Sequence, residues 1–168
     1  MNIRIASEDD IEGIARVHLE SWKSTYQGII SESFLSNLTL EQRINNWKWT
    51  FKNLSQDEVI YIIEDDLGNI TGFANGGKCR ESGLEFSAEL YAIYLLKEVH
   101  GNGYGRLLFN TLIETLKQRK YHSFMLWVLE DNPSINFYKK QGGLFILKKE
   151  ILIGEDKLTE VALGWKEI

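Results

Sequence analysis

The chain has 168 residues, of which 43% are hydrophobic and 26% charged, a composition typical of a globular protein that forms one domain over residues 1–168. The formal net charge is −5 and no long basic cluster is present, which argues against nucleic acid as a partner. No apolar run reaches the length of a transmembrane helix, residues 1–6 lack the apolar core of a signal peptide, and the single Cys79 cannot form a disulfide within the chain. We therefore expect a cytoplasmic protein.

Hydrophobic spacing predicts a strand and two helices in the first third of the chain. Residues 2–6 are an expected strand that ends at Ser7, and the spacing from Ser7 to Asp10 is typical of a helix start. The apolar face of the first helix is expected to consist of Ile11, Ile14, Ala15, His18 and Trp22. A second helix is expected from about Thr39, with an apolar side formed by Trp47, Phe51 and Leu54.

The middle of the chain combines strands with one long helix. Residues 59–64 and 70–76 predict a β-hairpin, because a short polar and glycine-containing turn separates two apolar runs. A long strand is expected over 86–96. It is followed by a helix over 104–120, which has leucines at a spacing of four, and by a buried strand over 123–129.

The last part of the chain predicts a short helix and two strands. Asn132-Pro133 is typical of a helix start, since proline fits the first helical turn, and Gly142-Gly143 ends the helix. The final strands are expected near 145–152 and 158–165. This order of elements predicts an α/β fold with one mixed, mostly antiparallel sheet and helices on both of its faces.

The segment 100–106, His-Gly-Asn-Gly-Tyr-Gly-Arg, is the most informative feature of the chain. Its three glycines lie between an expected strand and the helix that begins at Tyr104. Backbone N–H groups at a helix start lack intrahelical partners and attract anions, and glycine lets the backbone approach a bulky phosphate. The segment lacks the Gly-Lys-Ser/Thr of a Walker A loop, and Arg106 stands where a dinucleotide fingerprint requires its third glycine. We expect it to bind a phosphorylated cofactor.

Residues 89–106 resemble the acetyl-CoA motif of the GNAT superfamily of N-acetyltransferases, which reads Gln/Arg-x-x-Gly-x-Gly/Ala. Gly103 and Gly105 stand at the two small positions, and His100 departs from the usual Gln or Arg. A second block over residues 127–143 also resembles the family, because Asn, Phe-Tyr and Gly follow one another in the family's order.

The resemblance extends to residues 21–28 and to Gly164-Trp165, so that it covers nearly the whole chain. It implies a GNAT-like fold in which two central strands splay apart to admit the cofactor. It also implies an acetyl-CoA-dependent N-acetyltransferase, an acyltransferase that moves an acetyl group directly to a primary amine of a small molecule or peptide.

Tyr138 is the candidate general acid. It belongs to a Phe-Tyr pair that resembles the position of the family's acid tyrosine. A phenol with a pKa of about 10 is protonated at neutral pH and can donate to a leaving thiolate with a pKa of about 8.5. The alternative is an ordinary half-buried tyrosine whose hydroxyl is bonded to the backbone.

Glu89 is the candidate general base, because some members of the family have a glutamate at the corresponding position. Strand alternation predicts that Glu89, Tyr91, Ile93 and Leu95 share one face, which would place the carboxylate among apolar neighbours. Two alternatives remain: Glu89 faces solvent at the start of its strand, or a chain of water molecules serves as the base.

The resemblance implies that the cofactor is held mostly by the backbone. Ile93, Tyr94 and Leu95 would pair with the pantetheine arm like a neighbouring strand. Asn132 would hydrogen-bond the pantetheine or thioester region, or cap the helix that follows it. The pyrophosphate would be cradled by Gly101, Asn102, Gly103, Tyr104, Gly105 and Arg106.

The N-terminal helical region forms one wall of the acceptor pocket in the family. Trp22 and Tyr26 would there hold a cationic amine by cation–π contact, with core packing as the competing role. We expect a small-molecule or peptide amine as partner and neither nucleic acid nor a membrane, and a homodimer is kept open as the assembly. No cluster has the spacing of metal ligands, so no metal is expected. Two other functions stay open, namely a non-catalytic acyl-CoA-binding sensor and a nucleotide-binding oxidoreductase.

Overall fold

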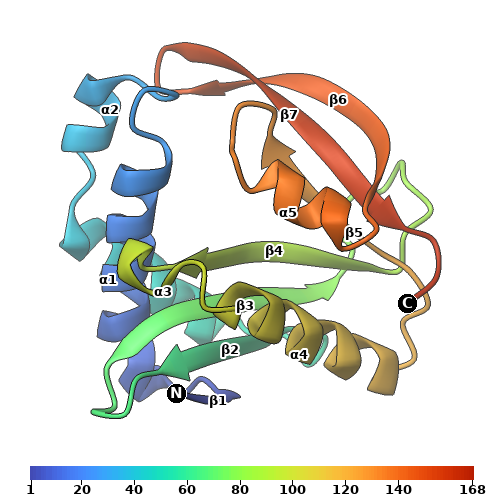
Figure 1. Cartoon of the computed structure of the whole chain (residues 1–168), viewed down its shortest axis with the longest axis horizontal. Coiled ribbons are helices and arrows are strands. Elements are labelled where there is room, and N and C mark those ends of the chain that lie inside the picture. The colour runs from blue at the N-terminus through green and yellow to red at the C-terminus, as the bar shows by residue number, and fades with distance from the viewer.

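One sheet of seven strands organises the chain, in the order β1-β2-β3-β4-β5-β7-β6 (Figure 1). The structure is a computed structural model that describes residues 1–168. The strands are β1 (Asn2–Ile5), β2 (Val59–Glu64), β3 (Ile70–Lys78), β4 (Ala88–Leu95), β5 (Phe124–Leu129), β6 (Leu144–Ile153) and β7 (Asp156–Trp165). All neighbours are antiparallel except β4 and β5, which confirms the predicted mixed, mostly antiparallel sheet.

Five α-helices accompany the sheet. They are α1 (Ile11–Thr25), α2 (Glu32–Ser36), α3 (Leu40–Lys52), α4 (Tyr104–Gln118) and α5 (Ile135–Lys140), with 3-10 turns at Glu8–Asp10 and Lys97–Val99. The sequence did not predict α2, which at five residues is too short to show an apolar repeat. The placement of Leu54 on the apolar side of α3 is wrong, because the helix ends before it and Leu54 is 38% exposed. None of the helices combines the length and apolar character needed to cross a membrane.

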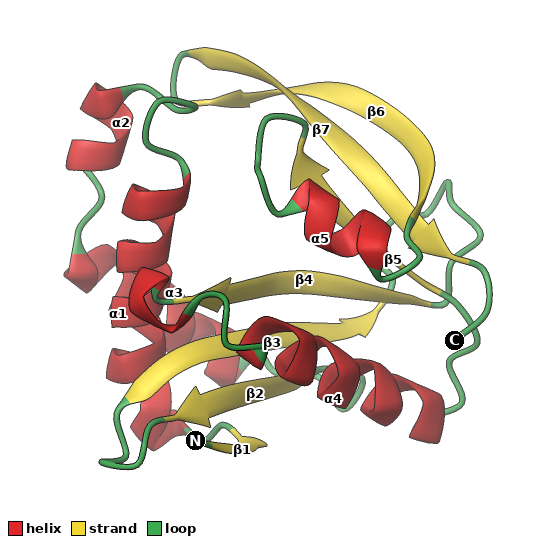
Figure 2. Cartoon of the chain, in the orientation of Figure 1, coloured by secondary structure: helices red, strands yellow, loops and turns green.

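The helices cover opposite faces of the sheet, with α4 and α5 on one side and α1 and α3 on the other (Figure 2). Alternate residues of β2 show the division. Val59 and Ile63 join the hydrophobic core under α4, whereas Ile60 and Ile62 join the core under α1. A strand buried on both faces requires apolar residues at every position, as the run 59–63 provides.

The two central strands separate part-way along their length. β4 and β5 pair in parallel only from Ala88, opposite Phe124, to Leu90, opposite Leu126. Both strands continue beyond this point without pairing to each other, and Figure 1 shows β5, β6 and β7 turning away from β1–β4. The splayed central strands are therefore present as predicted, and they leave backbone groups unpaired along the edge of β4.

A β-bulge lies where the separation begins. Asn75 of β3 lies opposite Ala92, and the next residue, Gly76, lies opposite Leu90, so that Tyr91 has no partner on β3. An extra residue in one strand reverses the alternation of faces on its far side.

The bulge overturns one expectation about β4. Ile93 and Leu95 pack against the core under α4, whereas Tyr94 packs against the core under α1. Glu89 precedes the bulge and lines the same cavity as Tyr94. The prediction that Glu89 shares a face with Ile93 and Leu95 is therefore wrong, because simple alternation does not hold across the bulge.

Candidate active site

The glycine loop between β4 and α4 presents unused backbone donors. Gly101 and Gly103 have φ angles of 80° and 83°, which favour glycine, and Gly103 is the N-cap of α4. None of the backbone N–H groups of residues 101–106 donates a hydrogen bond to the backbone, and a Cβ at Gly101 or Gly103 would meet no atom within 4 Å. These donors at the positive end of α4 form an open cradle that fits an anion such as a pyrophosphate.

Two side chains hold the shape of this loop. His100 Nε2 lies 3.0 Å from the carbonyl oxygen of Leu95, so the histidine at the usual Gln or Arg position braces the loop against the end of β4. The amide of Asn102 donates to the carbonyl groups of Val99 and His100, at 3.3 Å each. Asn102, a predicted cofactor contact, is therefore engaged through its side chain with the loop itself and offers a ligand its backbone N–H.

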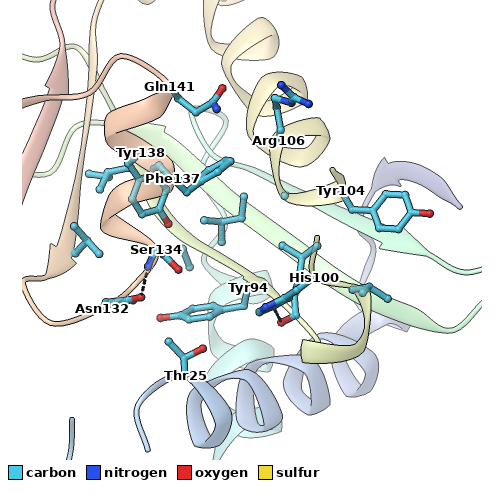
Figure 3. A pocket seen from close by; sticks show the side chains of 18 of the residues that line it. Thr25, Tyr94, His100, Tyr104, Arg106, Asn132, Ser134, Phe137, Tyr138 and Gln141 are labelled. Carbon is cyan, nitrogen blue, oxygen red and sulfur yellow. Dashed lines mark hydrogen bonds between the residues drawn. The ribbon is translucent and has the colours of Figure 1, made fainter. Parts of the chain in front are cut away.

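A cleft of about 460 Å³ extends from the loop to the gap between β4 and β5 (Figure 3). The predicted cofactor-binding residues that line it are Ile93, Tyr94, Leu95, Gly101, Gly103, Tyr104, Gly105, Arg106 and Asn132. Asn102 is absent from the lining. Arg106 is exposed at the start of α4, where its guanidinium can meet a phosphate.

The edge of β4 offers a strand-like binding surface to the cleft. The N–H of Leu96 bonds to the carbonyl of Thr71 on β3, so alternate residues, Ile93 and Leu95, direct their backbone groups away from β3. The carbonyl of Leu95 already accepts from the hydroxyl of Ser21 at 2.9 Å and lies 3.0 Å from His100 Nε2. The groups left open are therefore those of Ile93 and the N–H of Leu95. An extended ligand that carries amide groups can pair with these residues. By the same alternation, the backbone of Tyr94 bonds to β3, and only its side chain lines the cleft.

Tyr138 of α5 points into the cleft with a hydroxyl that no protein group binds (Figure 3). The side chain is 7% exposed, and its ring packs against Phe109 and Phe137 at centroid distances of 6.3 and 5.3 Å. Burial, assisted by Tyr94, raises the pKa of Tyr138 above the ordinary value of a phenol. The alternative of a hydroxyl bonded to the backbone does not hold, and the protonated phenol is free to donate into the cleft.

Asn132 lies at the start of the turn into α5 and is 6% exposed. Its Oδ1 accepts from the N–H of Ser134 at 2.9 Å, and its Nδ2 donates to the hydroxyl of Tyr26 at 3.4 Å. Asn132 therefore closes the turn that leads into α5, whose own N-cap is Ser134, so the predicted helix start at Asn132-Pro133 lies two residues too early. The amide also links the cleft to Tyr94, since the hydroxyls of Tyr26 and Tyr94 lie 3.4 Å apart.

A second cavity of about 540 Å³ lies beside the cleft. Its polar wall includes the carboxylates of Glu81, Glu89 and Glu160. The residues that line both spaces are Tyr26, Leu90, Tyr91, Tyr94, Trp127 and Val128. The cleft and the cavity therefore meet where β4 and β5 separate.

Glu89 lines this second cavity rather than the cleft, and it is 2% exposed. Arg80 holds its carboxylate: Nη2 lies 2.6 Å from Oε1, while Nε and the backbone N–H lie 3.1 and 3.0 Å from Oε2. Glu89 is therefore neither surrounded by apolar groups nor turned to solvent, because Arg80 in the loop between β3 and β4 reaches it. Nothing in the local sequence marks Arg80, which the antiparallel pairing of Lys78 with Ala88 brings close.

Trp22 and Tyr26 both line the second cavity, and both also pack within the protein. Trp22 Nε1 donates to the hydroxyl of Tyr94 at 3.0 Å, and the Arg43 guanidinium lies 4.8 Å from the centroid of the Trp22 ring. One face of Trp22 is thus already occupied by a cation. The competing packing role is therefore present in both residues, and their contact with an acceptor stays a prediction.

The model of the Acetyltransferase (GNAT) family matches residues 19–143 of the chain. The chain belongs to the GNAT acetyltransferase family. An uncharacterized N-acetyltransferase of Bacillus subtilis, YuaI, is 35% identical over 100% of this chain and 94% of its own length. The spermidine N(1)-acetyltransferase of Thermoplasma acidophilum is 25% identical over 95% of this chain and 96% of its own length.

Solved structures agree with this membership of the GNAT family. The PaiA N-acetyltransferase of Thermoplasma acidophilum, solved in complex with coenzyme A, has a TM-score of 0.70 and 26% identity, over 95% of this chain and 98% of that one. YncA of Salmonella typhimurium, a putative acetyltransferase solved with acetyl-CoA, has a TM-score of 0.72 and 18% identity, over 98% and 92% of the two chains. The predicted GNAT-like fold is confirmed.

Further residues that the sequence did not single out complete this GNAT site. Thr25, Ser134 and Gln141 line the cleft (Figure 3), and Lys149 joins the carboxylates around the second cavity. Thr25 adjoins Tyr26, and Ser134 and Gln141 flank α5 within the block 127–143, so these three lie beside residues that the sequence did single out, whereas Lys149 reaches the cavity only through strand pairing. The structure brings together no group of three or more His, Cys, Asp or Glu side chains that could hold a metal ion.

Proposed function

We propose that this GNAT protein is an acetyl-CoA-dependent N-acetyltransferase that transfers acetyl directly to a primary amine of a small molecule or peptide. The observation that carries the proposal is the junction of two spaces where β4 and β5 separate. One space has an anion cradle and a strand edge, and the other has a wall of aromatic and acidic side chains. Acetyl-CoA supplies the acetyl group as a thioester, and its transfer to an amine forms an amide and releases a thiolate.

The cleft provides the parts that acetyl-CoA needs. The free N–H groups of residues 101–106 and the guanidinium of Arg106 would hold the pyrophosphate. The backbone groups of Ile93 and the N–H of Leu95 would pair with the pantetheine arm, which carries amides. The relatives solved with coenzyme A or acetyl-CoA support this assignment.

An alkyl ammonium loses two protons on the way to the amide, one before it attacks and one from the nitrogen of the tetrahedral intermediate, and the departing sulfur gains one. Tyr138 would donate its proton to the departing sulfur, because its hydroxyl faces the cleft without a protein partner. The second nitrogen proton would restore the phenol of Tyr138 after it has protonated the sulfur. An alkyl ammonium with a pKa of about 10.4 must lose a proton before it can attack. Glu89, on the side of the second cavity, would accept that proton directly or through water, and Arg80 would hold its carboxylate in place.

The second cavity suits a cationic acceptor. It contains three carboxylates, of Glu81, Glu89 and Glu160, and two cations, of Arg80 and Lys149. Among the side chains that line the cavity one negative charge is therefore unmatched, and Arg43, at 4.8 Å from the Trp22 ring centroid, is a further cation nearby. A relative named as a spermidine acetyltransferase supports an amine of this kind. A cytoplasmic location and a homodimer stay predictions.

The test is acetyl-CoA-dependent turnover with a panel of amines, followed by the release of free thiol, together with calorimetry of acetyl-CoA binding. A transferase binds acetyl-CoA and releases thiol only when an amine is present. Tight binding without amine-dependent release for any class of amine would indicate an acyl-CoA sensor instead. Absence of acetyl-CoA binding would remove both readings.

A further inference from the structure

Three neighbouring strands place side chains in a row along the second cavity. Trp127 comes from β5, Glu160 from β7 and Lys149 from β6. Glu160 of β7 lies directly opposite Lys149 of β6 on one side and Leu129 of β5 on the other. Trp127 is two residues before Leu129 on β5, so its side chain points to the same face of the sheet. The row is therefore a consequence of strand register, and it lies on the face away from α5.

Lys149 occupies this row in the manner of a bound ammonium ion. Its Nζ lies 3.8 Å from the centroid of the Trp127 ring, 3.5 Å from Oε1 of Glu81 and 4.0 Å from Oε2 of Glu160. Trp127 Nε1 donates to the same Oε1 of Glu81 at 3.0 Å, which fixes the ring beside the carboxylate. We name Glu81, Trp127 and Glu160 the ammonium box.

The ammonium box could hold a second cation beside the Lys149 ammonium. Two carboxylates face one ammonium, and the third cavity carboxylate, Glu89, is engaged by Arg80. The contacts of Lys149 are long, and its side chain is 42% exposed, so this ion pairing is weak and open to exchange. Burial is the main cause of the raised pKa of Glu160, and another cation nearby would favour its ionised form.

We propose that the acceptor carries a second cationic group, as aliphatic di- and polyamines do, and that the ammonium box binds this distal group. The reacting amine lies at the junction near Tyr94, and the distal ammonium replaces or joins the Nζ of Lys149 over Trp127. Lys149 thus fills the box when no acceptor is bound and competes with the acceptor for it. This inference rests on the proposed amine acetyltransfer and adds the class of amine.

The first test compares amines of equal length, hexylamine against 1,6-diaminohexane and pentylamine against 1,5-diaminopentane. Calorimetry on the protein with coenzyme A gives affinities, and turnover with acetyl-CoA gives KM. We expect the diamine to bind roughly tenfold more tightly, since it adds one cation–π contact and a partly buried charge pair. Glu160→Gln should remove most of this preference. Glu150→Gln, the same change at an exposed residue of β6, should keep it.

The second test removes the competing cation. Lys149→Met keeps the apolar stem but leaves the box with two unpaired carboxylates, so diamine affinity should rise several-fold while monoamine affinity changes little. Lys148→Met, at the exposed neighbouring position, should change neither. Should Glu160→Gln fail to fold, Glu81→Gln serves in its place.

The outcomes separate the two levels of the proposal. Equal affinity for monoamines and diamines, or a preference that survives both Glu160→Gln and Glu81→Gln, overturns the ammonium box and leaves acetyl transfer to other amines intact. A diamine preference in calorimetry that is lost in Glu160→Gln, without thiol release for any amine, supports the box and overturns the transferase.

Discussion

Replacing Tyr138 with phenylalanine tests whether its hydroxyl donates a proton to the leaving sulfur. The substitution keeps the ring, which packs against Phe109 and Phe137, and deletes a hydroxyl that makes no hydrogen bond within the protein. The free energy of unfolding should therefore change by less than about 0.5 kcal/mol, since no internal partner is stranded. If the hydroxyl protonates the leaving sulfur, kcat should fall by about 10²-fold, which corresponds to about 2.7 kcal/mol of barrier. We choose the lower end of the range for a positioned acid because a thiolate already leaves readily.

The assay is thiol release at saturating acetyl-CoA, together with acetyl-CoA affinity by calorimetry and urea unfolding. The loss should be equal in kcat and kcat/KM, as expected for an interaction made in the transition state, and acetyl-CoA affinity should stay near the parent value. Tyr121→Phe, which loses a hydroxyl bonded to Asp57 and lines neither the cleft nor the second cavity, is the matched control. A stable Tyr138→Phe enzyme with parental kcat would refute the acid role.

Three further predictions follow from the site and the core. Gly103→Val should weaken acetyl-CoA binding at least tenfold in calorimetry, whereas Gly68→Val, with the same φ of 83° and equally open surroundings, should leave it unchanged. Glu89→Gln should lower kcat and alter the acidic limb of the pH–rate profile. The exposed control Glu85→Gln should keep the parent profile. If Glu89→Gln also keeps the parent profile, water remains as the base. Burial lowers the pKa of His18 from 6.5 to about 3. Between these two pH values the imidazole is protonated in the unfolded chain and neutral in the folded protein. The free energy of unfolding should therefore fall by about 1.4 kcal/mol per pH unit as the pH drops from about 6 toward 4, and His18→Gln should flatten this dependence in urea titrations.

The cofactor side of the site could be predicted from the sequence because its parts are contiguous. The end of β4, the glycines and the first turn of α4 lie within residues 93–106, so local geometry alone places the free N–H groups together. Tyr138 was predicted on a different ground, its resemblance to the Phe-Tyr pair of the family, and the structure places its side chain in the same cleft. His100 and Asn102 show the limit of such a motif, because their side chains serve the loop itself.

The charged partners around the second cavity could not be predicted in this way, although the sequence did single out Trp22, Tyr26 and Glu89 of its lining. The partner of Glu89 is Arg80, and the ammonium box joins Glu81 to side chains of β5 and β7, far away in sequence. Only strand pairing brings these groups together. The periodicity of one strand does not reveal which charged residue of another strand lies opposite. The helix α2 was missed for a different reason, because five residues are too few to show a helical repeat.

The bulge at Tyr91 links the two sides of the site. Without it, strict alternation would turn the side chains of Glu89 and Ile93 to the same face of β4, and Tyr94 would lie on the other. With it, Tyr94 and Glu89 line the second cavity, while Ile93 packs toward α4, on the face where Tyr138 lies. A group that takes a proton from the amine and a group that gives one to the sulfur can then approach the junction from opposite faces. One inserted residue thus reverses the facing of β4 at the point where it separates from β5, and the direct transfer that we propose would use both features.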